Sequence, residues 1–319
     1  MQWLPEIDSQ GACPKNVSRY RLWVLEVLLD NSKQALILGL CAVLLWSTVA
    51  TAFKIALRYL DVFSLVALAS VVSALVLVFW LATQNRLGEL VVALRSQSFK
   101  YLVMACINPL LYYVILLTAY DLLPAQQAQT INYTWAIVLS LLAVPVLGQR
   151  LLLKDLAAIA VGYLGVVIIA TQGSLNFGAI QSTLGLTLAL ISTLVWAGFW
   201  LANARLKEAK DVALAAMFVM ASPVAFAYLV FGGGLAQLSW QGFGAAVYVG
   251  LFEMGVTFLL WSQALSRAVH VARVANLIFL APVFSLVLIH VVLDEPIHPA
   301  TLVGFALIVP AILLQQRAA

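Results

Sequence analysis

The stretch LILGLCAVLLW at Leu36–Trp46 recurs as LTLALISTLVW at Leu186–Trp196, with five identical positions at a spacing of 150 residues. A second pair follows in the same order, since Ala136–Leu151 aligns with Pro282–Ile297 at a spacing of 146. Leucine recurs by chance in apolar chains, but here the order and spacing of the apolar runs repeat as well. The sequence therefore predicts two similar halves.

Composition indicates a membrane protein. Hydrophobic residues make up 64% of the chain and charged residues 9%, whereas soluble domains average about half and about a quarter. A soluble fold could not bury so much apolar surface behind a polar exterior. The three cysteines, Cys13, Cys41 and Cys106, are odd in number and two lie in apolar runs, so no disulfide framework is expected. In a membrane protein the charges that give the net +4 are distributed according to the membrane topology, so we expect no nucleic acid partner.

Ten apolar runs approach the length of a membrane-spanning helix, about 20 residues. The predicted spans are 34–53, 62–83, 99–119, 125–147, 155–172, 184–204, 212–231, 241–263, 270–292 and 298–315. They form one five-helix repeat at residues 34–172 and another at 184–315. Residues 1–33 are more polar and lack a signal-peptide pattern, so they are expected in the cytoplasm. The predicted fold is an all-α integral membrane protein of ten transmembrane helices.

Lysine and arginine predict the orientation, because cytoplasmic loops are enriched in both. With a cytoplasmic N-terminus, only Lys54 and Arg58 of the 17 basic residues fall outside, and the other 15 fall inside. Both termini are then cytoplasmic. Five helices are an odd number, so the second repeat enters the membrane inverted. Inverted repeats that open alternately to either side are typical of secondary transporters, and a carrier is predicted.

Three stretches resemble a known family. Leu45–Leu57 (LWSTVATAFKIAL) resembles the first-helix signature of EamA-type exporters in the drug/metabolite transporter superfamily, with a tryptophan and a lysine eight residues later. Leu147–Leu151 (LGQRL) and Leu293–Ile297 (LDEPI) resemble the Leu-Gly-Glu-Arg-Leu of that family, although Gln149 and Asp294-Glu295-Pro296 depart from it. The resemblance covers residues 34–315 and implies a transporter fold.

A narrower resemblance concerns the substrate. Asn132-Tyr133-Thr134-Trp135 is similar to the Asn-Tyr-Leu-Trp-Pro stretch of the aromatic amino acid exporter branch, with departures at Thr134 and Ala136. The proline missing at Ala136 is present at its repeat partner, Pro282. The resemblance implies export of aromatic amino acids.

Two predicted spans are interrupted at matching places. Asn108-Pro109 lies inside the third span, and Glu253-Met254-Gly255 lies inside the eighth at a spacing of 145. Proline removes a helical hydrogen bond and leaves a carbonyl for a ligand or water. Matched interruptions in two halves are a pointer to a binding site at the midplane of the membrane. The alternative is that both are packing kinks.

Glu253 is the only acidic residue deep in a predicted span. A charged carboxylate there costs about 2.5–3.5 kcal/mol on insertion scales, so such residues face a cavity or a partner. Three roles remain open: Glu253 binds the ammonium group of a substrate, carries a coupling proton, or is protonated in a helix contact.

Aromatic residues supply the other expected part of the site. Trp46 lies 12 residues into the first span, or about 18 Å at 1.5 Å per residue, and Trp196 has the same depth in the second half. Tryptophan usually lies at the membrane interface, so midplane tryptophans indicate helix packing or an aromatic pocket. Five more aromatic residues lie within spans and join this expected pocket: Tyr112, Tyr113, Tyr133, Trp135 and Trp200.

Polar residues in the fourth and ninth spans predict the two entrances to the site, one on each side of the membrane. Arg273 and Asn276 make the inner half of the ninth span polar. The outer half of the fourth span is polar through Gln126, Gln129, Thr130, Asn132 and Tyr133. Helix N-termini carry partial positive charge suited to a carboxylate. Together with Glu253 and the aromatic residues, these groups match the carboxylate, ammonium and side chain of an amino acid.

Enzymatic functions fit poorly. The three histidines have no cysteine or carboxylate at metal-ligand spacing, and no phosphate-binding loop is present, so we expect neither a cofactor nor a metal. The sequence predicts a multi-pass secondary transporter of the bacterial inner membrane that exports small amphiphilic metabolites by alternating access, with lipid around it and protons as one candidate coupling ion. The alternatives are another exported metabolite or drug, and a membrane protein that transports nothing.

Overall fold

The computed structural model describes residues 15–147, 153–174, 181–206, 208–234, 238–268, 274 and 276–316. Within these ranges every regular element is a helix, which confirms the predicted all-α fold. The helices of the first half are α1 (Lys15–Ala56), α2 (Val62–Thr83), α3 (Leu87–Ser96), α4 (Ser98–Ala105), the π-helix η1 (Cys106–Leu111), α5 (Tyr112–Leu122), α6 (Ala125–Asn132), α7 (Trp135–Leu147) and α8 (Leu153–Ala170). Those of the second half are α9 (Thr183–Ala204), α10 (Lys210–Phe231), α11 (Trp240–Phe252), α12 (Val256–Arg267), the 3₁₀ helix η3 (Asn276–Phe279), α14 (Leu280–Leu293) and α15 (Pro299–Gln316).

Seven helical stretches of the described chain are long and apolar enough to cross a membrane. Three shorter apolar helices, at Leu156–Ala170, Leu280–Leu293 and Pro299–Ala311, fall where the fifth, ninth and tenth spans are predicted. A multi-pass membrane protein is therefore confirmed, while the number of ten crossings stays a prediction. The first candidate span, Asn31–Ala56, begins close to the predicted residue 34, although the helix α1 that contains it begins earlier, at Lys15.

Polar side chains define where several helices begin. Asp61 accepts hydrogen bonds from the backbone N–H groups of Phe63 (2.9 Å) and Ser64 (3.0 Å) at the start of α2. Ser182 does the same for Gly185 at α9, and Ser239 for Gly242 at α11. These bonds satisfy N–H groups that have no partner within the helix.

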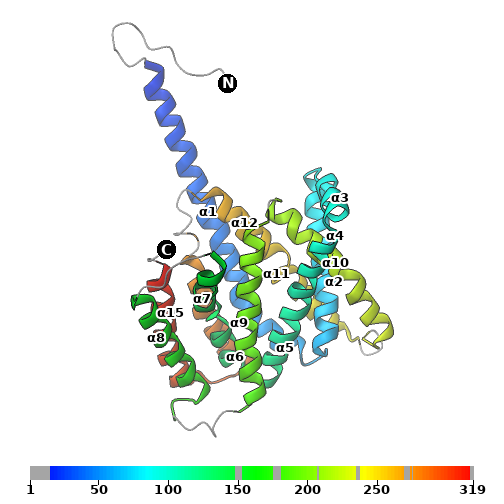
Figure 1. The fold of residues 1–319 in the computed structure, drawn as a ribbon, viewed down its shortest axis with the longest axis vertical. Helices are drawn as coiled ribbons and strands as arrows, with labels where there is room; N and C mark the ends of the chain where they lie inside the picture. Colours follow the sequence, from blue (N-terminus) through cyan, green and yellow to red (C-terminus); the bar gives the residue numbers. More distant parts are fainter. Residues whose placement is uncertain are drawn as a thin grey trace.

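Each half of the chain packs its first helix against the other half. The helix α1 contacts α12 and α14 of the second half, and α9, its counterpart, contacts α5 and α7 of the first half. The remaining long helices pair as counterparts, α2 with α10 and α8 with α15, which form opposite edges of the molecule (Figure 1). The two halves therefore interlock around a shared centre.

Glycine permits the closest of these helix contacts. A Cβ atom on Gly304 of α15 would lie 2.6 Å from the carbonyl oxygen of Gly165 on α8, and a Cβ on Gly165 would lie 2.6 Å from the oxygen of Gly304. Small residues at such crossings let helix backbones approach closely in membranes. The pairing of α8 and α15 depends on both positions being glycine.

Candidate substrate site

The two predicted helix interruptions are present. Asn108 has extended backbone angles (φ −144°, ψ 119°) between α4 and α5, and the Asn108–Pro109 peptide bond is cis. In the second half, α11 ends at Phe252 and α12 begins at Val256, with Gly255 at φ −110° and ψ −92°. The matched interruptions predicted from the sequence are confirmed, and both open the helical backbone inside an apolar span.

Two further departures from regular α-helix repeat between the halves, and neither is predicted from the sequence. The predicted fourth span divides into α6 and α7 at Tyr133 and Thr134, and α14 begins only at Leu280 after the short helix η3. Tyr133 and Phe279, the residue that precedes Leu280, are separated by the repeat spacing of 146. Each half of the described chain thus departs from regular α-helix at two corresponding places.

Glu253 and Asn108 are buried polar groups at these interruptions. Glu253 is 9% exposed as a residue, and its Oε1 accepts a hydrogen bond of 3.0 Å from the hydroxyl of Tyr113. Its Oε2 has no partner among the described residues. Asn108 is 1% exposed, and neither atom of its amide is hydrogen-bonded there. Buried polar atoms without partners are costly in a protein, so these atoms point to a site that a polar ligand completes.

The predicted aromatic residues form one cluster beside this carboxyl group. Tyr112 stacks on Trp196 with ring centroids 4.3 Å apart and contacts Tyr113 at 4.9 Å. Trp196 also contacts Trp200 at 5.6 Å. Since Tyr113 holds Glu253, the cluster runs from the carboxyl group to α9.

Phe258 connects the remaining tryptophan to this cluster. Its ring lies 5.6 Å from that of Trp46, 6.1 Å from that of Trp196 and 6.3 Å from that of Trp200. Trp46 also lies close to the Glu253 carboxyl group. The two tryptophans predicted to lie at the midplane therefore belong to the same aromatic surface, joined by a phenylalanine that the sequence does not single out.

Asn132 ties the polar end of α6 to the cluster. Its Nδ2 donates to the hydroxyl of Ser192 on α9 at 2.9 Å, and its Oδ1 lies 3.5 Å from the hydroxyl of Tyr112, which donates to it. Asn132 thus orients the same tyrosine that stacks on Trp196. Ser192 was not predicted, and a serine in an apolar helix gave no signal of this role.

Of the other predicted residues, some form no close ring pair with the cluster within the described chain, and others lie outside it. Tyr133 is half-buried and packs with the residues around Trp261, and Trp135 is half-buried at the start of α7. Within the described ranges no close ring pair includes Trp135. Arg273 lies outside these ranges, and only the backbone of Asn276, at the start of η3, is described.

Comparison with known proteins matches this architecture. The EamA-like transporter family matches the chain twice, at residues 33–171 and 183–315. The Bacillus subtilis (strain 168) protein "Uncharacterized transporter YvbV" is 24% identical over 293 residues, covering 90% of this chain and 92% of that protein. An Archaeoglobus fulgidus "Uncharacterized transporter" is 23% identical over 278 residues, covering 86% and 94%.

A solved crystal structure supports the fold alone. Its chain is 22% identical to this one, with a TM-score of 0.62, and the match covers 89% of this chain and 99% of the other. The two family matches extend over most of the sequence, and the relatives are named as transporters. The protein belongs to the EamA-like transporter family and is a multi-pass membrane transporter.

Proposed function

We propose that this transporter exports aromatic amino acids by alternating access across the inner membrane of a bacterium. The observation that carries the proposal is the buried carboxyl group of Glu253, which is joined through Tyr113 to the ring cluster of Tyr112, Trp196 and Trp200. A carboxylate is suited to the ammonium group of an amino acid, and aromatic rings are suited to its side chain.

The amide of Asn108 supplies unpaired polar atoms at the matching interruption of the first half. Its donor and acceptor are both free among the described residues, so it can bind either charged end of the substrate. Arg273 and the helix N-termini at the breaks are the proposed partners of the substrate carboxylate. Together these groups would recognise an amino acid head group beside an aromatic surface.

Alternating access follows from a proposed arrangement of ten helices in two inverted repeats, residues 34–172 and 184–315, with both termini in the cytoplasm. The two family matches and the reciprocal packing of α1 and α9 support it. In this arrangement the broken helices of both halves surround one site, and rocking of the halves exposes it to each side in turn. Protons remain a candidate coupling ion because Glu253 can exchange one.

Counterflow in proteoliposomes tests the proposal. Vesicles loaded with unlabelled phenylalanine should accumulate labelled phenylalanine, tyrosine or tryptophan from outside, and labelled alanine should accumulate much less. The variant Glu253→Gln should lose this accumulation, while Glu89→Gln, which changes an exposed carboxylate on α3, should keep it. Equal accumulation of alanine would contradict the proposal, and full accumulation by Glu253→Gln would show that Glu253 does not bind the substrate.

A second function is favoured by a different cavity. About 520 Å³ of mainly apolar space lies between α1, α11 and α14, bordered by Thr48, Ile55, Tyr248 and Leu288 among others. Ligand pockets for drug-sized molecules are typically about 300–1,000 Å³ and mostly apolar. If labelled amino acids do not exchange but a hydrophobic cation such as ethidium is expelled from the vesicles, drug export is the function.

A further inference from the structure

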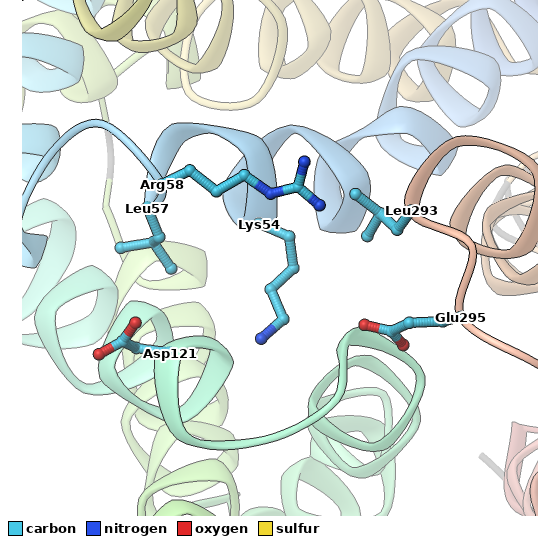
Figure 2. A pocket seen from close by; sticks show the side chains of 6 residues that line it. All are labelled: Lys54, Leu57, Arg58, Asp121, Leu293 and Glu295. Atoms are coloured by element: carbon cyan, nitrogen blue, oxygen red, sulfur yellow. The ribbon is translucent and has the colours of Figure 1, made fainter.

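A smaller cavity lies where α1 ends, where α5 is followed by α6, and where α14 is followed by α15. Its volume is about 260 Å³, and it is separate from the site at Glu253. Six side chains line it: Lys54, Leu57, Arg58, Asp121, Leu293 and Glu295 (Figure 2). Four of the six carry charges, two of each sign, so the cavity has the opposite composition to the aromatic site.

The charges are arranged by sign. Lys54 lies in the last turn of α1 and Arg58 in the turn that follows this helix, whereas Asp121 comes from α5 and Glu295 from the segment after α14. Figure 2 shows the amino group of Lys54 directed between the two carboxylates. The ion pairs within 4.0 Å among the described residues involve Arg86 and Lys100, and none lies in this cavity. The opposite charges face one another without direct pairing.

One of the two carboxylates is already engaged. The oxygens of Glu295 accept hydrogen bonds from the backbone N–H groups of Ala125 (3.0 Å) and Gln126 (3.4 Å), at the start of α6. Asp121 is exposed and makes no hydrogen bond or ion pair in the described part of the chain. Asp121 is therefore the carboxylate that is free to accept a hydrogen bond from a ligand. Glu295 connects the opposite wall of the cavity to the start of α6.

We propose that this cavity is a second binding site, which takes the zwitterionic head group of an amino acid. The ammonium group would bind Asp121, and the carboxylate would bind Lys54 and Arg58. The cavity is smaller than the pockets of about 300–1,000 Å³ that enclose drug-sized ligands, so it holds the head group and leaves the side chain outside. The inference rests on the proposed function, because it assigns the same class of substrate to a second step of its passage.

Protection from alkylation tests this site without requiring transport. Leu57 lines the cavity, so Leu57→Cys, in a chain whose three native cysteines are replaced by serine or alanine, reports on its occupancy. In purified protein in detergent, phenylalanine should slow the reaction of this cysteine with a charged maleimide. Phenethylamine, which lacks the carboxylate, and 3-phenylpropionate, which lacks the ammonium group, should protect much less at the same concentration.

Charge-removing variants give the matched controls. Lys54→Gln and Asp121→Asn should each weaken protection by phenylalanine about tenfold, the order expected for a hydrogen bond to a charged group. Asp294→Asn should leave it unchanged, since Asp294 is exposed, does not line the cavity and has a positive φ (56°) that asparagine tolerates.

The two proposals fail separately. Equal protection by all three compounds, or protection that survives both Lys54→Gln and Asp121→Asn, would overturn the second site, whatever the counterflow assay gives. Protection by phenylalanine in a protein that shows no counterflow would support the second site and overturn the proposed export. If phenylalanine exchanges in the counterflow assay but gives no protection from alkylation, the proposed export is retained and the second site is overturned. The four charged side chains of the cavity are then only a solvated surface.

Discussion

At the scale of single residues, Glu253 separates three mechanisms. One oxygen is held by Tyr113 and the other is unpartnered among the described residues. If the carboxylate binds the substrate ammonium, Glu253→Gln should reduce counterflow and net export together by about 10- to 100-fold, since hydrogen bonds to charged groups contribute about 1.5–3 kcal/mol. Loss of the response to a pH gradient with counterflow intact would instead assign it a coupling proton. Unchanged transport in both assays would make it a packing residue.

The aromatic residues give a second prediction at this scale. Trp196 contacts four other rings, whereas Trp135 is absent from the close ring pairs of the described chain. Stacking contributes about 0.5–1.5 kcal/mol beyond area burial, so Trp196→Leu should raise the half-saturating substrate concentration several-fold. Trp135→Leu is the matched control and should change it less. Size-exclusion profiles of both variants should match the native protein, and an equal effect of the two changes would exclude a specific role for the cluster.

The sequence identified these residues unevenly, and the reason is physical. Glu253 and Asn108 stand out because polar groups are rare in apolar spans, where each needs a reason to be buried. Phe258 joins Trp46 to Trp196 but is one of 15 phenylalanines, and its spacing carries no mark of its neighbours. Contacts between rings from separate helices depend on how those helices cross.

At the scale of elements, some irregular places in the helices could be predicted from the sequence and others could not. Proline and glycine predicted the interruptions at Pro109 and Gly255. The break between α6 and α7 has neither residue nearby; there the hydroxyl of Thr134 donates to the carbonyl of Ile131 at 2.7 Å. A threonine hydroxyl can compete for helical carbonyls in this way, but most threonines in helices do so without a break. The sequence therefore indicated two of the four places where the described spans depart from regular α-helix.

The crossing of α8 and α15 gives a prediction for stability. Gly304→Ala places a Cβ atom 2.6 Å from the carbonyl oxygen of Gly165, so the helices must separate. Overpacking costs about 1–3 kcal/mol, and the variant should unfold at a lower temperature in detergent. Gly244→Ala on α11, where a Cβ would meet nothing within 4 Å, is the control and should not destabilise. A Gly304→Ala protein as stable as the native one would show that the two helices do not pack closely.

At the scale of the whole molecule, the basic residues predict which side faces out. A cysteine at Gly233, which has open space around it, should react in intact cells with an impermeant thiol reagent. A cysteine at Lys210, which is exposed at the opposite end of α10, should react only after the cells are opened. The exposed native cysteines Cys41 and Cys106 must first be replaced, together with Cys13. The opposite pattern of reaction would contradict the predicted orientation.

The reciprocal packing of α1 has a consequence for how the protein is made. Chains leave the ribosome from the N-terminus, so α1 enters the bilayer first, while its main partners α12 and α14 are synthesised some 200 residues later. Until then its inward face meets lipid, and the first half cannot complete its own packing. A nascent chain stopped after residue 172 should therefore be recognised as incomplete and degraded, whereas the two halves produced as separate polypeptides in one cell should assemble. The packing of α1 in the membrane therefore depends on helices that are synthesised near the end of the chain.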